Sequence, residues 1–442
     1  MAGRTLDFAE YIGTPDVLAN AIGNKYLEWA NQRRSWVEDK KELRNYVFAT
    51  DTTKTSNATL PWKNSTTTPK LCQIRDNLHA NYMAALFPND DWLLWEGDDE
   101  DAEAEEKRKV ISSYIKNKLR YGNFINIVST MVYDFIDYGN VIGTTEYVNE
   151  TRIDEETGEV YPGYVGPRAV RLSPYDVLIN PVATSIDNSP KLIRYIKSLG
   201  EVAADIEDHP EMGYLSEVFN DIVTVRQNVS GLSTHDVDKA EGFTIDGFGS
   251  IFEYYQSDYV ELLEFHGDIY DTSTKTLLKN RIITIADRQR VIRNVANPSW
   301  RGQSIRHAGW RLRPDNLYAM GPLDNLVGMQ YRIDHLENLK ADVFDMIAHP
   351  IAKVQGFVED FSFGPGEKIY VGEDGNVEFM RPDTTALNAD TQIAILENKM
   401  EEMAGAPRQA MGIRTPGEKT AFEVQTLDNA SSRVFMNKVS YF

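Results

Sequence analysis

The sequence Gly321-Pro322-Leu323-Asp324-Asn325 opens the stretch that decides the fold, because this turn can start a helix. Beyond the turn, apolar residues recur at steps typical of one helix face, at Leu323, Leu326, Ile333, Leu336, Val343, Phe344 and Ile347. This spacing predicts an amphipathic helix that buries one side. His349-Pro350 should end the helix, because proline disfavours helical backbone in the residue before it.

The rest of the C-terminal part reads as alternating helices and turn-rich segments. Short strands are expected at 368–371 and 377–380, and Gly372-Glu373-Asp374-Gly375-Asn376 between them predicts a hairpin. A second helix is expected at 390–404, then a Gly/Pro loop at 408–417, then a third helix from near Glu418 to Phe442. This order of a long helix, a small lobe and further helices suits a rod-like assembly that carries a small domain at one end.

Length, composition and cysteine count limit the classes of protein to which this chain can belong. The 442 residues predict about two to four domains, and with 42% hydrophobic residues the chain can bury a sizeable core. Cys72 is the single cysteine, which leaves no disulfide within the chain and no thiolate zinc cluster. Residues 1–5 lack the apolar run of a signal peptide, and no run of ~18 apolar residues predicts a membrane helix.

The formal net charge of −21 weighs against tight, non-specific binding of DNA, which comes from neutralising phosphates with Lys and Arg. An acidic wall is compatible with a protein that encloses DNA and lets it slide. The plainer interpretation is that acidity keeps a soluble protein dispersed.

The first 320 residues predict an α+β body with helices first and short antiparallel strands after them. Helices are expected at 22–48, 72–86, 102–121, 124–138 and 192–206. Strands are expected at 141–148, 164–172, 177–181, 259–266, 281–285 and 290–294, with a hairpin turn at 154–159. Residues 50–70 and 215–249 are polar and weakly patterned, and we expect a loop and a long connection there.

Three stretches could carry chemistry. Residues 96–106 hold eight carboxylates, but the alternating pattern of a calcium loop is missing, so a solvated helix start is favoured. The stretch from Gly412 to Gly417-Glu418-Lys419-Thr420 misses a phosphate-binding loop by one residue, because Glu418 separates the glycine from the lysine.

The third stretch interleaves basic and aromatic residues: Arg306, Arg311 and Arg313 among Trp300, Trp310 and Tyr318. Such a pattern can bind single-stranded nucleic acid by stacking, but an irregular, buried connection with arginines in ion pairs is favoured. The seven histidines show no metal-ligand spacing. We therefore predict no catalytic residue, no metal ligand and no cofactor.

Taken together, the C-terminal part resembles the portal (head-to-tail connector) proteins of tailed bacteriophages, in the short-tailed podovirus style. The resemblance is strongest over 297–442 and rests on four elements. These are Gly309-Trp310-Arg311-Leu312-Arg313-Pro314-Asp315-Asn316-Leu317-Tyr318, Gly321-Pro322-Leu323-Asp324-Asn325-Leu326, Ile333-Asp334-His335-Leu336-Glu337-Asn338 and Arg414-Thr415-Pro416-Gly417-Glu418-Lys419-Thr420-Ala421-Phe422-Glu423-Val424.

The resemblance implies a portal fold in a non-enzymatic ring, typically a dodecamer, whose channel passes double-stranded DNA during packaging and ejection. It implies a wing at 1–320, stem helices at 321–347 and 388–407, and a clip at 348–387. It also implies a tunnel loop at 408–418 and the start of a long wing helix at 419–442. The partners would be the major capsid protein, the terminase large subunit and a head–tail adaptor protein, with no membrane involved. The site would be the virion portal vertex, reached from the host cytoplasm during assembly.

By the same resemblance, two groups of residues would carry function. The tunnel loop would present Arg408, Gln409, Arg414, Thr415 and Lys419 to DNA. The clip interface would present Lys368, Tyr370, Glu373, Asp374 and Glu378 to the motor and adaptors. The family continues beyond the last helix, whereas Ser440-Tyr441-Phe442 brings no cap or stop, so we expect a truncated chain. The alternative is a soluble, magnesium-dependent enzyme that processes nucleic acid with scattered carboxylates.

Overall fold

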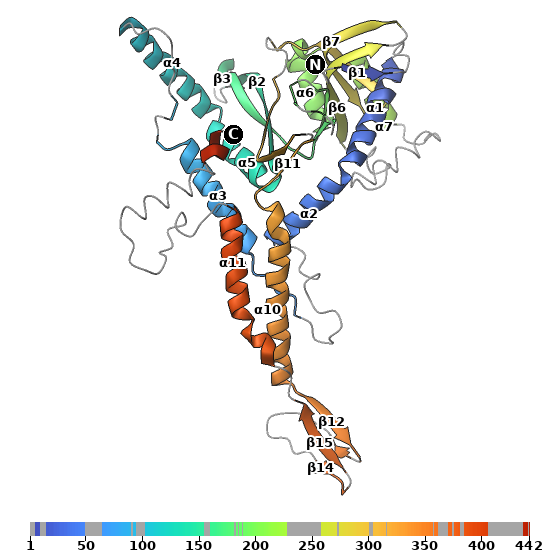
Figure 1. Cartoon of the computed structure of the whole chain (residues 1–442). Helices are drawn as coiled ribbons and strands as arrows, with labels where there is room; N and C mark the ends of the chain where they lie inside the picture. The colour runs from blue at the N-terminus through green and yellow to red at the C-terminus, as the bar shows by residue number, and fades with distance from the viewer. Residues whose placement is uncertain are drawn as a thin grey trace. The chain divides into compact units, whose positions relative to one another are not determined.

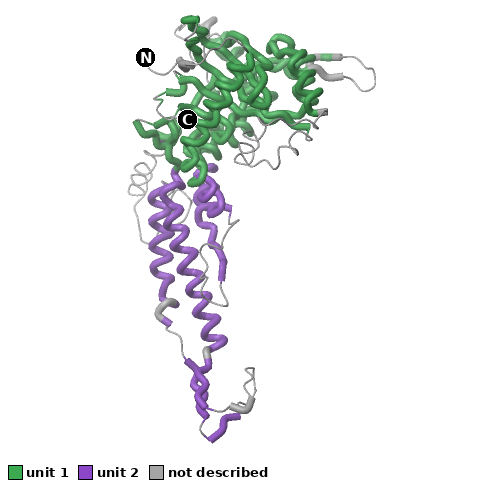
Figure 2. The backbone as a smooth tube through the Cα atoms, turned by 90° about the vertical axis from the view of Figure 1, so that its right-hand side faces the viewer, with its two compact units in different colours: residues 1–39, 81–321, 437–442 green, residues 40–80, 322–436 purple. Residues whose placement is uncertain are grey.

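The computed structural model contains helices and sheets in two compact units. It describes residues 5–8, 15–48, 64–89, 92–93, 102–153, 160–180, 183, 185–187, 189–227, 258–271, 274–299, 304–314, 316–356, 358–360, 370–373, 375–380, 384–404, 436–440 and 442. Unit 1 comprises residues 1–39, 81–321 and 437–442, and unit 2 comprises 40–80 and 322–436 (Figure 2). The mixed composition confirms the α+β class. Residues 40–80, predicted as part of the wing, group with the C-terminal unit.

Helices occupy the N-terminal third of the chain much as periodicity predicts. They are α1 Pro15–Gln32, α2 Arg34–Phe48, α3 Lys70–Leu86, α4 Ala102–Tyr121 and α5 Phe124–Asp137 (Figure 1). The predicted helix at 22–48 begins earlier and divides at Arg33, whose guanidinium donates to the carbonyls of Pro174 (3.0 Å) and Val177 (2.9 Å). None of the described helices combines the length and apolarity that crossing a membrane requires.

A six-stranded sheet forms the centre of unit 1. Its antiparallel path is β4-β5-β6-β7-β8, and β1 pairs in parallel with β6. The strands are β1 Thr5–Phe8, β4 Val177–Ile179, β5 Lys191–Ser198, β6 Tyr259–Asp271, β7 Thr276–Ala286 and β8 Arg290–Ala296.

Alternation along β6 places helices on both faces of this sheet. Leu263 and Phe265 join a core with Ile22 of α1. Their neighbour Leu262 joins a second core with Val202 of α6 (Leu199–Asp208), to which α7 (Ser216–Gln227) also contributes. The sheet is therefore buried on both sides, which explains its continuous apolar strands.

A second sheet has the order β3-β2-β9, and a short pair, β10-β11, follows it in the chain. The strands are β2 Asn140–Ile153, β3 Val160–Leu172, β9 Arg306–Gly309, β10 Arg311–Arg313 and β11 Asn316–Met320. Ile153 pairs with Val160, which confirms the predicted hairpin, whose turn at 154–159 lies outside the described residues. The prediction of an irregular connection before Tyr318 is wrong, because 306–320 forms strands.

Two further expectations for unit 1 are wrong. The predicted helix at 192–206 is the strand β5 up to Ser198, and only then the helix α6. Its apolar residues fit either period, but Ser198 and Glu201 form a capping box that fixes where the helix begins. The predicted connection at 215–249 contains α7, and residues 228–249 lie outside the described part.

Unit 2 contains the two helices predicted from the opening stretch. The turn η4 (Asp324–Leu326) leads into α10 (Val327–Ala348), which ends at His349 as predicted. The turn η5 (Thr384–Ala389) leads into α11 (Asp390–Ala404), whose bounds match the prediction, and α10 and α11 lie side by side (Figure 1).

The small lobe between these helices differs from its prediction in how its strands pair. It contains β12 Ile351–Gln355, β13 Val358–Asp360, β14 Tyr370–Val371 and β15 Asn376–Met380. The expected hairpin of β14 with β15 is wrong, because β15 pairs with β12 and β14 pairs with β13. The turn itself is present, since the Gly375 N–H donates to the Gly372 carbonyl (2.9 Å). Pairing with earlier strands supplies a longer antiparallel ladder than the hairpin would.

Candidate functional site

The residues predicted to meet DNA cannot be placed. Arg408, Gln409, Arg414, Thr415 and Lys419 all lie outside the described residues. Within the expected third helix, the structure describes 436–440, which are helical, and Phe442. The tunnel-loop assignment therefore stays a prediction.

The predicted clip residues are placed in part. Lys368 and Asp374 lie outside the described residues, whereas Tyr370, Glu373 and Glu378 are exposed. Glu378 of β15 lies opposite Lys353 of β12, and Tyr370 belongs to the other strand pair. Large apolar side chains are exposed beside them: Val354, Val371, Phe379 and Met380. The lobe thus presents a mixed apolar and acidic surface, although Tyr370 and Glu378 belong to separate sheets.

The most organised polar site in unit 2 lies along one side of α10. Four polar residues recur every fourth position and are at most 1% exposed: Gln330, Asp334, Asn338 and Asp342. Facing them is the segment Asn64 to Pro69, which has no helix or strand of its own and which we call the strap. We call the four α10 side chains the acceptor ladder.

Backbone N–H groups of the strap and of the first turn of α3 donate to the acceptor ladder in order. Asn64 N donates to Asp342 Oδ1 (3.1 Å), Thr66 N to Asn338 Oδ1 (2.9 Å) and Thr68 N to Asp334 Oδ1 (3.0 Å). Leu71 N completes the series by donating to Gln330 Oε1 (3.2 Å). The ladder therefore does for this segment what a neighbouring strand does in a sheet.

The match has a geometric basis. Two residues of extended chain advance about 6.7 Å, and four residues of α-helix advance about 6 Å. Every second strap residue therefore lies opposite every fourth residue of α10. Residues four apart lie on the same face of a helix.

Side chains strengthen this contact at both ends of the strap. The Asn64 amide donates to Asp342 Oδ1 (2.9 Å) and Asp345 Oδ2 (2.8 Å). The Gln330 amide donates to the Thr68 carbonyl (2.6 Å) and to Asp334 Oδ1 (2.8 Å). Burial raises the pKa of the Asp334 carboxyl to about 6, against the smaller opposing effect of its hydrogen bonds.

Buried ion pairs attach the neighbouring helices of unit 2 to the same frame. Lys40 of α2 pairs with Asp324 of η4, and the Lys40 side chain is 2% exposed. Lys70 Nζ, at the start of α3, lies 2.7 Å from Glu401 Oε1 of α11, and both side chains are largely buried. Because breaking a buried pair leaves an uncompensated charge, these contacts define specific positions for both helices.

The apolar side of α10 is covered over only part of its length. Ile333, Leu336 and Val343 are buried as predicted, but Phe344 is 56% exposed and Ile347 is 43% exposed. Asp390, the first residue of α11, pairs with Lys340 (2.5 Å), so α11 begins beside the turn that precedes Phe344. Ile395 and Met403 of α11 are exposed as well. Unit 2 by itself therefore leaves an apolar surface in contact with water.

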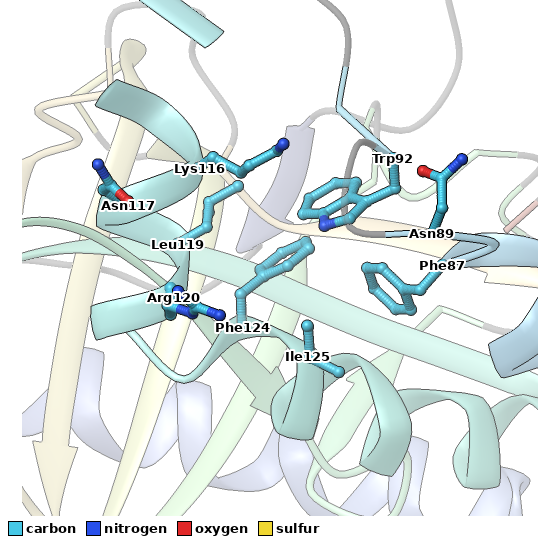
Figure 3. Close-up of a pocket in the computed structure, with 9 residues that line it drawn as sticks. All are labelled: Phe87, Asn89, Trp92, Lys116, Asn117, Leu119, Arg120, Phe124 and Ile125. Carbon is cyan, nitrogen blue, oxygen red and sulfur yellow. The ribbon is translucent and has the colours of Figure 1, made fainter. Parts of the chain in front are cut away.

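Unit 1 contains a pocket of about 540 Å³ where α3 ends and α4 meets α5 (Figure 3). Trp92 stacks on Phe124 (ring centroids 5.7 Å apart), and Phe87 meets Trp92 edge-on (5.0 Å). Lys116 and Arg120 of α4 line the same pocket. Arg120 lies in the last turn of α4, where a basic residue also offsets the helix dipole, so the two cations do not by themselves indicate an anionic ligand.

Other ionisable side chains of unit 1 pair with one another or stack on aromatic rings. No cluster of three or more His, Cys, Asp or Glu side chains within the described residues could hold a metal ion. In the large sheet, Glu264 is buried against His266 Nε2 (2.5 Å) and Arg293 Nη1 (3.3 Å), an arrangement that compensates its charge. Arg311, predicted to pair or to stack, lies over the Trp310 ring (5.0 Å), and Arg306 pairs with Asp187 (3.2 Å).

The acceptor ladder is a site that sequence reasoning missed. The prediction for this helix rested on its apolar periodicity alone, which predicts one buried side and makes no prediction for its polar residues. The signal was present as amide and carboxylate side chains at a strict spacing of four between Gln330 and Asp342.

Comparison with known proteins adds no relative: no protein-family model matches the chain, and neither does any curated protein. The basis for a function is therefore the chain itself and the resemblance described above.

Proposed function

We propose that this chain is a subunit of a bacteriophage portal, a ring whose channel passes double-stranded DNA and joins capsid to tail. The observation that carries the proposal is the construction of unit 2. Its helices α10 and α11 flank a small β lobe, and their outer apolar residues remain exposed. Stem, clip and stem follow one another in this order in the family that the sequence resembles.

The exposed residues favour a ring over an isolated subunit. Soluble monomers rarely leave contiguous large apolar side chains in water. Phe344 and Ile347 continue the buried stripe of α10, and identical neighbours would cover them in a closed ring. A dodecamer is the number that the resemblance implies.

The net charge of −21 is consistent with DNA that passes without adhering. Tight non-specific binding needs many Lys and Arg contacts to phosphate, and such contacts would hold DNA in place. A few basic residues of the tunnel loop, Arg408, Arg414 and Lys419, would then provide the contacts that position it.

The remaining partners follow from the same proposal. The clip would meet the terminase large subunit during packaging and the head–tail adaptor afterwards, through the exposed Tyr370, Glu373 and Glu378. The wing would lie against the major capsid protein at the portal vertex of the virion. Assembly would take place in the host cytoplasm, and the ATP-hydrolysing motor would be a separate protein.

Two experiments test the proposal. Native mass spectrometry and electron-microscope class averages should give a multimer with a central hole, whereas a monomer at all concentrations would count against a portal and favour the enzyme alternative. Charge reversal, Arg414→Glu or Lys419→Glu, should impair DNA packaging or retention while leaving the ring intact. Arg313→Glu, at an exposed position of β10, is the matched control and should package normally. Normal packaging in the loop variants would remove the tunnel-loop assignment.

A further inference from the structure

The two carboxylates of the acceptor ladder are satisfied on one side only. Asp334 and Asp342 each hold the strap through Oδ1, while Oδ2 of each is buried and has no hydrogen-bond partner among the described residues. The other two members, Gln330 and Asn338, are neutral. Neutral and ionisable acceptors therefore alternate along the contact, and an ionised Asp334 places a buried negative charge there without full compensation.

The surrounding charges do little to relieve Asp334. The strap itself, residues 64–69, contains no titratable side chain. On α10, Glu337 is a further negative charge that disfavours ionisation of Asp334. The nearby ammonium of Lys70 pairs with Glu401 of α11, and that of Lys40 pairs with Asp324. Each of these cations has a carboxylate of its own.

We propose that the strap is a proton-operated clasp on α10: a proton on Asp334 favours the docked strap, and its loss favours release. Release would return Asp334 to water and free the acceptor ladder. The inference does not depend on the proposed function, because it concerns one subunit.

The direction follows from linkage. Burial raises the pKa of Asp334 from its ordinary value of 3.8 to about 6 when the strap is docked. The docked state therefore holds its proton in the interval between these values, so docking strengthens as pH falls through 6 and weakens as pH rises through it. The full difference corresponds to about a hundredfold, but this is reached only below the ordinary pKa. Between pH 7.5 and pH 5 the docked carboxyl is titrated over about one pH unit, so we expect at most about tenfold.

Hydrogen exchange of the strap amides measures this directly. The protection of the Thr66 and Thr68 amides, corrected for intrinsic exchange at each pH, should be about tenfold greater at pH 5 than at pH 7.5. Asp334→Asn keeps an acceptor for Thr68 and removes the charge, so its protection should be high and independent of pH. The matched control is Asp345→Asn, which alters an exposed carboxylate that also bonds the strap and should keep the wild-type pH dependence.

Two results would overturn the clasp. One is equal protection of the wild-type strap at both pH values, which needs no variant and so does not depend on the folding of Asp334→Asn. The other is an unchanged pH dependence in Asp334→Asn, which would assign the effect to another group. Amides of α11 serve as the internal reference and should change little. A ring that forms normally while the strap fails either test would leave the portal proposal standing.

Discussion

Gly139 occupies a position in unit 1 that admits no side chain. It lies between α5 and β2 with φ at 68°, in the left-handed region. A Cβ atom there would lie 2.3 Å from the Gly321 nitrogen and 2.4 Å from the Met320 carbonyl carbon. Both are backbone atoms, so no change of rotamer relieves the contact. Gly321 in turn approaches the Ile136 carbonyl, where its own Cβ would lie at 2.7 Å.

The cost of Gly139→Ala has two parts. The left-handed conformation costs roughly 1–2 kcal/mol for a residue with a Cβ. Relieving the overlap by shifting backbone costs a further ~1–3 kcal/mol, as for overpacked cores. We therefore expect the free energy of unfolding to fall by about 2–5 kcal/mol.

Gly328→Ala is the matched control. Gly328 lies in α10, and no atom of a described residue lies within 4 Å of the position that its Cβ would take, apart from its chain neighbours and the helix's own backbone. Gly328 is the second residue of α10, so alanine should be favoured there by no more than the about 0.8–1.0 kcal/mol of a helix interior, and this variant should be more stable than the wild type. The same substitution is thus expected to act in opposite directions at the two sites.

Urea unfolding followed by far-UV circular dichroism tests both variants. The unfolding midpoint should fall for Gly139→Ala and rise for Gly328→Ala, with an unchanged slope for each transition. A Gly139→Ala protein within about 0.5 kcal/mol of the wild type, the range of a neutral surface change, would refute the close approach at Gly321.

Three further outcomes are expected. Arg171→Met should lower the free energy of unfolding by about 3 kcal/mol, because Asp134 is 2% exposed and loses its hydrogen bonds of 2.5 and 2.7 Å to the guanidinium. Urea unfolding measures this change, and an unchanged midpoint would contradict it. Ser198→Ala should lower the free energy of unfolding by about 1 kcal/mol, because it removes the capping box of α6. Thermal unfolding measures this, and an unchanged melting temperature would argue against the cap. Phe344→Ser with Ile347→Ser should reduce oligomer mass in light scattering while leaving subunit stability unchanged; an intact oligomer would exclude this stripe as the interface.

Local patterns in the sequence predicted several of the helices well, although α7 was missed. Leu71, Ile74, Leu78 and Tyr82 repeat at helical spacing, and each is buried in α3. The helix at 390–404 also has the predicted bounds, because Gly and Pro residues flank an unbroken amphipathic segment. Both predictions depend only on residues that are close to one another in the sequence.

Features that depend on distant residues were harder to predict. The strand β15 was expected at the right place, but its partner is β12, whose residues lie about 25 positions earlier in the chain. Phe344 was expected to be buried because its spacing fits the apolar stripe, yet burial requires a distant segment to cover it, and it is exposed. The acceptor ladder was missed for the same reason, since the strap that gives it meaning begins at Asn64.

The spacing of the acceptor ladder also limits its own length. Each step of two residues of extended strap is about 0.7 Å longer than the matching four residues of α10, so the donors and acceptors become progressively misaligned along the contact. After three or four steps the offset reaches roughly 2–3 Å, more than a hydrogen bond tolerates. The extended part of the contact stays below this limit, because it has only two such steps, from Asn64 to Thr68. The chain then turns into α3 at Lys70, and Leu71 N donates the last bond. A single-residue insertion in either segment would misalign every later pair, so the lengths of two segments some 260 residues apart are tied together.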